Sequence, residues 1–154
     1  MKRINREGRI INLYTNGDKQ NGFLSFLEST KDIEFKIKRV YYIYSVPKGT
    51  KRGHHAHKEL NQFLIALNGK IKIILDNGKD KSEHILSDPS EGLFVGKGIW
   101  HTMEWLDENA ILLVLASEYY DESDYIRDYD EFLKMVKEGY WKEEMNDSKS
   151  WKEK

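Results

Sequence analysis

The 154-residue sequence contains no cysteine, only two prolines and almost no net charge, with 25 Lys and Arg against 26 Asp and Glu. The absence of cysteine excludes disulfides, thiolate nucleophiles, cysteine-ligated zinc and iron–sulfur clusters. A charge of -1 argues against binding to nucleic acid polymers or anionic membranes, which requires a basic surface. No apolar run reaches the roughly 20 residues of a membrane span. We therefore expect a cytoplasmic protein whose chemistry comes from histidine, carboxylate, tyrosine or a ligated metal.

The length predicts a single domain, and the composition changes only near the C-terminus. Residues 142–154 are rich in charged side chains and poor in apolar ones. We assign residues 1–140 to one domain and expect residues 141–154 to form a charged, flexible tail.

Short apolar segments between turn residues predict an antiparallel β-fold. Asn68-Gly69 is typical of a tight hairpin turn between two of these segments. The strands expected over this part of the chain are 62–67, 70–75, 83–86, 92–96, 99–106 and 110–116. The last of them is apolar on both faces and is predicted to be a central strand. Seven or eight strands at this spacing indicate a sandwich or a barrel.

Upstream, the apolar positions change parity between two segments. Ile33, Phe35 and Ile37 alternate with charged residues, which predicts a half-buried strand over 33–38. The apolar positions then move to Val40, Tyr42, Tyr44 and Val46. Because a strand changes its apolar face only through a bulge or bend, we expect one near residues 38–39.

One helix is expected near the C-terminus. Asp128 and Glu131 form a capping-box pattern, apolar residues follow at helical spacing, and Gly139 ends the segment. We interpret the preceding segment, residues 124–127, as packing this helix against the β-fold.

Three of the five histidines, His54, His55 and His57, lie within four residues. In an extended strand His55 and His57 project from the same face. Two imidazoles on one face either ligate a metal or transfer protons near neutral pH.

The spacing around these histidines, Gly49-x5-His55-x-His57-x4-Gln62-x6-Gly69, resembles the first cupin motif. The resemblance implies a jelly-roll antiparallel β-barrel with a short C-terminal helix. Metal-binding cupins usually have a carboxylate where this chain has Gln62, and an amide is a poor ligand for a divalent cation. Met103 stands where the second motif would supply a histidine, although His101 has the same strand parity. We expect no metal and no cofactor, with a metal site on His55, His57 and His101 as the alternative.

A wider set of matches, over roughly residues 8–135, resembles the metal-independent cupin family of 3,4-ketoisomerases that act on dTDP-4-keto-6-deoxyglucose. Its specific segments are residues 52–58, which hold the paired histidines, and residues 124–129, Asp-Tyr-Ile-Arg-x-Tyr. The resemblance implies that His55 and His57 are catalytic. It also implies a homodimer in which the N-terminal strands, within residues 1–30, are exchanged between subunits.

The activity that this resemblance implies moves a carbonyl from C4 to C3 of the sugar through an enediolate. The product would lead to a 3-amino-3,6-dideoxyhexose of a bacterial surface polysaccharide. Because the 4-keto group acidifies the C3 proton, two imidazoles supply a base and an acid without a cofactor. The assignment of base and acid to the two histidines stays open, as does the configuration produced at C4.

Five residues are candidates for binding the rest of the dTDP-sugar. Arg52 suits the diphosphate, because a planar guanidinium binds phosphate oxygens in a bidentate manner. Gln62 is a candidate donor to an enediolate oxygen. Tyr42, Tyr44 and Trp100 are candidates for lining the pocket or stacking on thymine. Three other functions stay open: a metal-dependent cupin enzyme of the dioxygenase type, a dTDP-sugar 3,5-epimerase, and a non-catalytic sugar-binding cupin.

Overall fold

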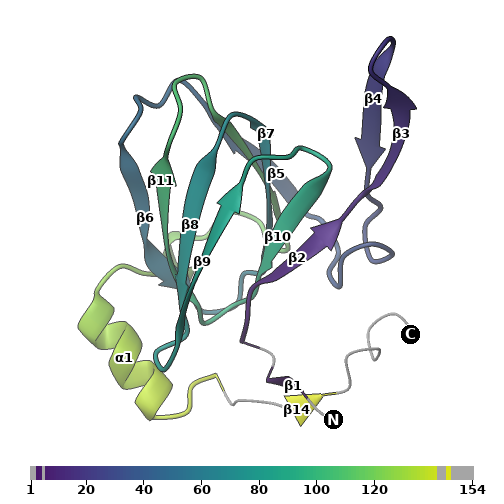
Figure 1. Cartoon of the computed structure of the whole chain (residues 1–154). Helices are drawn as coiled ribbons and strands as arrows, with labels where there is room; N and C mark the ends of the chain where they lie inside the picture. Colours follow the sequence, from purple (N-terminus) through teal and green to yellow (C-terminus); the bar gives the residue numbers. More distant parts are fainter. Residues whose placement is uncertain (1–2, 5, 142–144, 147–154) are drawn as a thin grey trace.

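The computed structural model describes residues 3–4, 6–141 and 145–146, and its body is a sandwich of two antiparallel five-stranded sheets (Figure 1). The first sheet has the order β2 (Arg9–Asn12), β10 (Glu91–Val95), β7 (Gln62–Asn68), β12 (Ile111–Ala116) and β5 (Arg39–Ile43). The second has the order β13 (Tyr125–Ile126), β6 (Lys51–His57), β11 (Trp100–Trp105), β8 (Ile71–Asp76) and β9 (Lys81–Leu86). The all-β, jelly-roll prediction is confirmed, as two facing sheets.

The strands predicted between residues 62 and 116 are all present within a few residues of their expected bounds. β7 ends at Asn68, and Gly69 and Lys70 join it to β8; Gly69 has a φ of 69°, the left-handed backbone that a tight turn uses. β12, which is apolar on both faces, lies between β7 and β5, so its prediction as an internal strand is confirmed.

Alternating side chains of the first sheet build two apolar layers. Leu64 and Ala66 of β7 face the second sheet and join the main core, which includes Ile73 of β8. Phe63 and Ile65 point the other way and are buried in a second cluster. The central strands of this sheet therefore have buried apolar side chains on both faces, which explains why they are apolar at nearly every position.

The strand predicted over residues 33–38 is wrong, because residues 27–38 contain turns and bends instead. Ile33 and Phe35 are nevertheless buried, against the outward face of the first sheet near Phe63. Their alternation with charged residues comes from a loop packed on a sheet. β5 begins after this loop, and its inward residues are Tyr41 and Ile43.

The predicted helix is confirmed as α1 (Tyr129–Lys137), whose N-cap Asp128 accepts hydrogen bonds from the backbone N–H groups of Asp130 and Glu131. Its buried residue, Phe132, packs with Ile126 and Trp141 against the outer face of the second sheet. Trp141 was expected to begin the tail, but it is only 6% exposed. The compact part of the chain thus reaches at least residue 141, while 142–144 and 147–154 lie outside the described residues.

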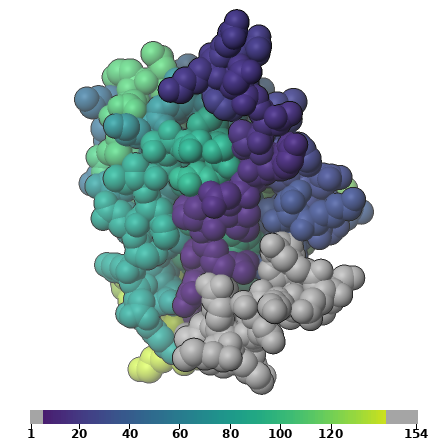
Figure 2. All heavy atoms as spheres, turned by 45° about the vertical axis from the view of Figure 1, so that its right-hand side comes forward, coloured from purple at the N-terminus to yellow at the C-terminus, as the bar shows by residue number. Residues whose placement is uncertain are grey.

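A hairpin of β3 (Tyr14–Asp18) and β4 (Gly22–Phe26) projects away from the sandwich, as the purple strands in Figures 1 and 2 show. Every residue of both strands is exposed, including Phe23 at 65% and Leu24 at 61%. The remaining strands, β1 (Arg3–Ile4) and β14 (Met145–Asn146), pair with each other. In the described part of the chain, no helix has the length and apolar character needed to cross a bilayer.

Candidate active site

A β-bulge in β6 determines which side chains of the histidine segment face the interior. His55 pairs with His101 of β11, Arg52 pairs with Met103, and the register shifts between these pairs. Gly53 and His54, in the bulge, have φ values of 92° and 58°. Because cross-strand partners share a face, the extra residue places Arg52 on the same side as His55.

Gly53 is required in this bulge by close packing as well as by its backbone angle. A Cβ atom at this position would lie 2.9 Å from the carbonyl oxygen of His101 and 3.3 Å from the methyl carbon of Met103. The glycine therefore allows β6 to approach β11 at the level of the histidines.

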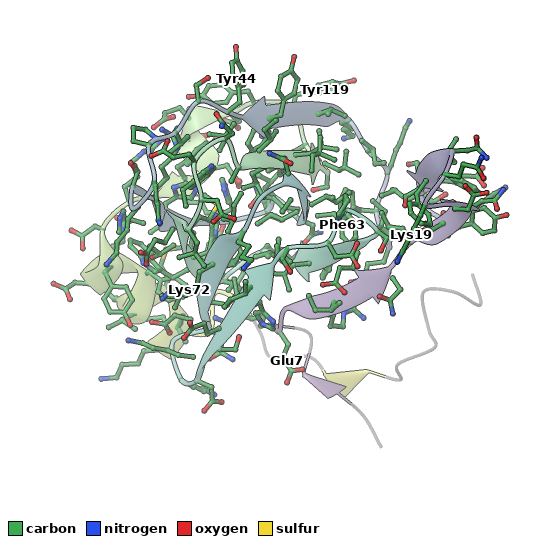
Figure 3. The ribbon with its side chains drawn as sticks, turned by 45° about the horizontal axis from the view of Figure 1, so that its top comes forward. Glu7, Lys19, Tyr44, Phe63, Lys72 and Tyr119 are labelled. Atoms are coloured by element: carbon green, nitrogen blue, oxygen red, sulfur yellow. The ribbon has the colours of Figure 1, made fainter. Side chains whose placement is uncertain are left out.

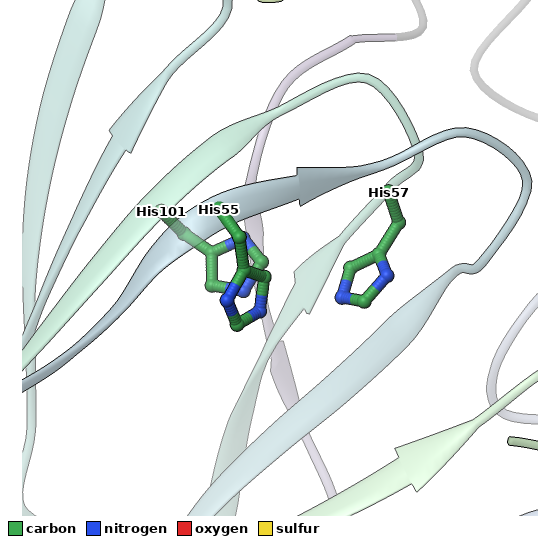
Figure 4. Close-up of side chains that lie close together, drawn as sticks. All are labelled: His55, His57 and His101. Atoms are coloured by element: carbon green, nitrogen blue, oxygen red, sulfur yellow. The ribbon is translucent and has the colours of Figure 1, made fainter. Parts of the chain in front are cut away.

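Three imidazoles meet between the sheets, and Figure 4 shows them on one side of the β6 ribbon. The ring centroid of His55 lies 5.0 Å from that of His57 and 4.6 Å from that of His101. One ring nitrogen from each histidine lies within 4.8 Å of the other two. His57 and His101 are 3% and 2% exposed, so the cluster is shielded from solvent on most sides.

In all three rings Nδ1 is the nitrogen that has a hydrogen-bond partner. Nδ1 of His55 lies 3.1 Å from the carbonyl oxygen of Gly53, and Nδ1 of His101 lies 3.2 Å from that of Ile99. Since a carbonyl oxygen only accepts, both rings donate from Nδ1 and keep the lone pair on Nε2. Nε2 of His57 is buried and has no hydrogen-bond partner among the described residues. The cluster therefore offers basic nitrogens to a molecule placed between the sheets.

The environment keeps two of the rings neutral. Burial, followed by the neighbouring His57, lowers the pKa of His55 to about 4. Burial also holds the pKa of His101 well below its usual value, with His55 and His57 adding to the effect. At pH 7 both side chains are thus uncharged, with Nε2 unprotonated.

A hydrogen-bonded pair from the first sheet, a buried amide and a half-buried phenol, lies beside the site. Gln62, which is 2% exposed, donates a hydrogen bond from Nε2 to the Tyr41 hydroxyl at 2.8 Å. Burial, followed by electrostatic coupling to Tyr125, raises the pKa of Tyr41 to about 12. Tyr41 stays protonated, and because Gln62 donates to its oxygen, its own proton is available to a ligand.

The short strand β13 closes the end of the site beside β6. Tyr125 pairs with His57, and its ring centroid lies 4.5 Å from that of His57 and 5.0 Å from that of His55. Arg127 lies over the Tyr125 ring at 4.4 Å. Residues 124–127 do pack near the helix through Ile126, as interpreted from the sequence, but they also line the site.

The structure brings some of the predicted binding residues to this site and places others elsewhere. Arg52 is exposed on the histidine side of β6 and has no ion-pair partner within the described part of the chain. Tyr42, on the outward face of β5, is 61% exposed, and Tyr44, just after the end of β5, is 62% exposed; Figure 3 shows Tyr44 pointing away from the body. Trp100 lies under α1, with its ring 5.2 Å from Tyr129.

Sequence reasoning missed Tyr41, Asp124 and Tyr125 as site residues. Finding Tyr41 requires knowing which residues of β5 face inward. The sequence pattern gave the wrong set, because the loop before β5 was predicted as a strand. Asp124 and Tyr125 stood in a segment read as structural. His101 and Met103 are two residues apart on one strand, so the sequence did indicate that their side chains share a face, and both are buried.

The same three imidazoles are the set that could hold a metal ion. Nitrogen ligands of one zinc ion lie about 3.4 Å apart, because Zn–N bonds are about 2.0–2.1 Å long. The three nitrogens here lie within 4.8 Å of one another, and no carboxylate belongs to the set found among the described residues. Gln62, at the position of the usual carboxylate, directs its amide to Tyr41.

Two facing antiparallel sheets with a histidine cluster between them define this protein as a jelly-roll sandwich of the cupin type. The family model described as FdtA: WxcM-like, C-terminal matches residues 6–137, and the chain belongs to this family. It is 45% identical over 130 residues to the TDP-4-oxo-6-deoxy-alpha-D-glucose-3,4-oxoisomerase of Aneurinibacillus thermoaerophilus, covering 84% of this chain and 93% of that protein.

Solved structures agree with this assignment. A 3,4-ketoisomerase from Helicobacter canadensis is 46% identical, with a TM-score of 0.81 over 85% of this chain and 98% of that one. QdtA, a sugar 3,4-ketoisomerase from Thermoanaerobacterium thermosaccharolyticum solved with TDP, is also 46% identical, with a TM-score of 0.81 over 85% and 95% of the two chains.

Proposed function

We propose that this protein is an isomerase, a dTDP-4-keto-6-deoxy-D-glucose 3,4-ketoisomerase. The observation that carries the proposal is the group of three imidazoles whose Nε2 atoms face the space between the sheets, together with the protonated Tyr41. The relatives support it, since the curated relative is a 3,4-oxoisomerase of the same sugar and a solved relative binds TDP.

The reaction needs two proton transfers at carbon and two at oxygen. A base removes the C3 proton, the electrons of the C3–H bond form a C3=C4 double bond, and the C4 carbonyl oxygen becomes an oxyanion that takes a proton. The C3 hydroxyl then loses its proton as its oxygen becomes the new carbonyl, and C4 accepts a proton from an acid. No electron acceptor is required, so the chain's own acid–base groups suffice.

His55 and His57 are the proposed acid–base pair, because they lie on one strand with rings 5.0 Å apart. Tyr41 is the proposed donor to the enediolate oxygen, held in position by Gln62. An amide at position 62 also avoids placing a negative charge beside a developing oxyanion. His101 extends the basic surface beside His55. No metal or other cofactor takes part in this proposal.

The nucleotide is proposed to bind where the site opens. Arg52 is the candidate for the diphosphate, since it is exposed on the histidine side of β6. A cavity of about 420 Å³ beside His57 is lined by Lys38, Arg39, Tyr119 and Tyr120, among others. These exposed tyrosines, of which Figure 3 labels Tyr119, replace Tyr42, Tyr44 and Trp100 as candidates for stacking on thymine.

A homodimer is part of the proposal and is supported by the projecting hairpin. A two-stranded hairpin is only marginally stable alone in water, yet β3 and β4 expose Phe23, Leu24 and Phe26. An apolar cavity of about 780 Å³ lies between this hairpin and the outward face of the first sheet. A second copy that exchanges its N-terminal strands would cover both surfaces.

The cellular setting follows from the proposed substrate. A nucleoside diphosphate sugar is doubly charged and does not cross a bilayer unaided, so a cytoplasmic location is proposed. The 3-keto product is the kind of compound that an aminotransferase converts to a 3-amino-3,6-dideoxyhexose, here proposed for a surface polysaccharide.

The test is to incubate the protein with dTDP-4-keto-6-deoxyglucose in deuterated water and follow C3, C4 and C5 by NMR. A ketoisomerase moves the carbonyl to C3 and introduces deuterium at C4, and the C4 coupling constants report the galacto or gluco configuration. Deuterium at C3 and C5 with the carbonyl still at C4 would instead indicate a 3,5-epimerase.

Two further outcomes would replace the proposal. Ligand binding without any conversion by the wild-type protein would indicate a non-catalytic sugar-binding cupin. A stoichiometric transition metal in the purified protein, needed for activity and lost with His101→Asn, would indicate a metal-dependent cupin enzyme.

A further inference from the structure

One histidine of the cluster differs from the other two in its hydrogen-bond partner. Nδ1 of His57 lies 3.2 Å from Oδ2 of Asp124, whereas His55 and His101 meet backbone carbonyls. A carboxylate carries a full negative charge and a carbonyl does not. Of the three histidines, only His57 therefore has a charged partner, the half-buried Asp124, that stabilises the ring when it becomes an imidazolium.

Asp124 is itself held in place from several sides. Its Oδ1 accepts a hydrogen bond from the backbone N–H of Glu59 at 2.8 Å, and its carbonyl oxygen accepts one from the N–H of Lys58 at 3.0 Å. It stands at the end of a short 3-10 turn (Glu122–Asp124) and directly before β13, which pairs with the end of β6. These contacts fix the carboxylate relative to His57.

The charge of Asp124 is maintained in this position. Burial opposes ionisation of its carboxyl group, but the hydrogen bonds from His57 and from the backbone N–H groups of Glu59 and Leu60 outweigh it and lower the pKa. A stable carboxylate accepts from Nδ1 of His57, which leaves the lone pair on Nε2. That nitrogen is buried and unpartnered within the described residues.

We propose that Asp124 is a positioning residue for His57: its carboxylate fixes the tautomer of His57 and stabilises the imidazolium that forms when His57, one member of the His55–His57 acid–base pair, takes up a proton. The proposal rests on the ketoisomerase function, in which the ring becomes an imidazolium when it takes a proton from the sugar and returns to the neutral form when it releases one.

The test compares Asp124→Asn with wild type by 15N NMR of the histidine rings and by turnover of dTDP-4-keto-6-deoxyglucose. In wild type the His57 ring is expected as the Nδ1–H tautomer. An asparagine amide that donates to Nδ1 shifts the proton to Nε2, so kcat is expected to fall about 10²–10⁴-fold with KM changed only a few-fold. Asp128→Asn, which makes the same change at the helix N-cap, is expected to keep wild-type kcat and the Nδ1–H tautomer.

Two results would overturn the proposal: a wild-type His57 ring protonated on Nε2, or an Asp124→Asn variant with wild-type kcat. The tautomer is measured on the wild-type protein, so this test does not depend on the folding of the variant. If wild type converts no substrate, the ketoisomerase function fails, while the ring measurement still decides the relation between Asp124 and His57.

Discussion

Gln62 of β7 donates a hydrogen bond to the hydroxyl of Tyr41 of β5. Tyr41 is electrostatically coupled to Tyr125, whose ring lies beside those of His55 and His57. The 2.8 Å hydrogen bond runs from the Gln62 amide nitrogen to the Tyr41 oxygen. Its direction matters, because a phenol that accepts from Gln62 can give its proton elsewhere. This pair connects the first sheet, which supplies the donor, to the second, which supplies the imidazoles.

Replacing Tyr41 with phenylalanine tests the phenol as the donor to the enediolate oxygen. Removal of one such donor typically lowers kcat by about 10²–10³-fold. We expect Tyr41→Phe to lower kcat within this range and to leave the fold intact, as judged by circular dichroism. Tyr42→Phe is the matched control on the outward face of the same strand, and an equal loss in both variants would contradict the inward assignment of Tyr41.

Gln62→Glu keeps the shape of the side chain but reverses the hydrogen bond. A carboxylate only accepts, so Tyr41 would donate to it and lose the free proton, and a negative charge would stand near the developing oxyanion. We expect kcat to fall at least 10-fold, measured by NMR of the sugar product. Gln62→Met, which cannot reverse the bond, is expected to lose less activity, and the opposite order would argue against this role.

The sequence predicts a strand correctly where its own apolar pattern matches its burial, and fails where a neighbouring loop is buried in the same pattern. The strands from 62 to 116 followed from their own pattern, since each is bounded by turns and, apart from the largely exposed β9, is buried on at least one face. The inward-facing residues of β5 could not be predicted in this way. Ile33 and Phe35 are buried in a loop whose apolar and charged residues alternate as in a strand.

In the site, too, some residues could be predicted from the local sequence and others depend on contacts between distant segments. Spacing placed His55 and His57 on one face of a strand, because extended backbone alternates its side chains, and the family resemblance implied their role. The contribution of Asp124 requires β13 to pair with the end of β6, a contact between segments 67 residues apart. The inward side of Arg52 requires the bulge at Gly53 and His54, whose positive φ angles give no signal in a pattern of apolar residues.

Protonation of the histidine cluster is expected to link stability to pH. The pKa of His55 is lowered to about 4, and that of His101 is lowered well below its usual value, both chiefly by burial. Between pH 6.5 and 4 the unfolded chain therefore binds protons that the folded chain does not. Stability is present above pH 6.5 and is lost as the pH falls through this window, by at most about 3 kcal/mol for His55.

Urea unfolding at pH 7, 6 and 5 measures this loss. In the double variant His55→Asn/His101→Asn, the free energy of unfolding is expected to change less with pH than in wild type. In His54→Asn, which lies on the exposed bulge, it is expected to change with pH as much as in wild type. The same pH dependence of the free energy of unfolding in all three proteins would rule out the histidine cluster as the cause of the stability loss.

Gly53→Ala tests whether the bulge sets the geometry of the site. An added Cβ meets the carbonyl oxygen of His101 at 2.9 Å, and φ is 92°. Gly49 has a similar φ of 89°, but a Cβ there has nothing within 4 Å. Both variants are expected to lose about 1 kcal/mol or more in the free energy of unfolding from backbone strain. Only Gly53→Ala is expected to lose activity as well; loss of activity in Gly49→Ala would contradict the steric argument.

The hairpin of β3 and β4 gives a test of the proposed dimer that is independent of catalysis. Its large apolar side chains are exposed on the single chain, so burial by a second copy is the main favourable contribution expected from them. The double variant Phe23→Asp/Leu24→Asp places two like charges in that contact and is expected to shift the protein to monomer in sedimentation velocity. Lys19→Glu, a charge change in the turn of the same hairpin, is expected to leave the dimer intact. A wild-type protein that sediments as a monomer would refute the proposed dimer, and a dimer that survives both aspartates would show that the hairpin is not its interface.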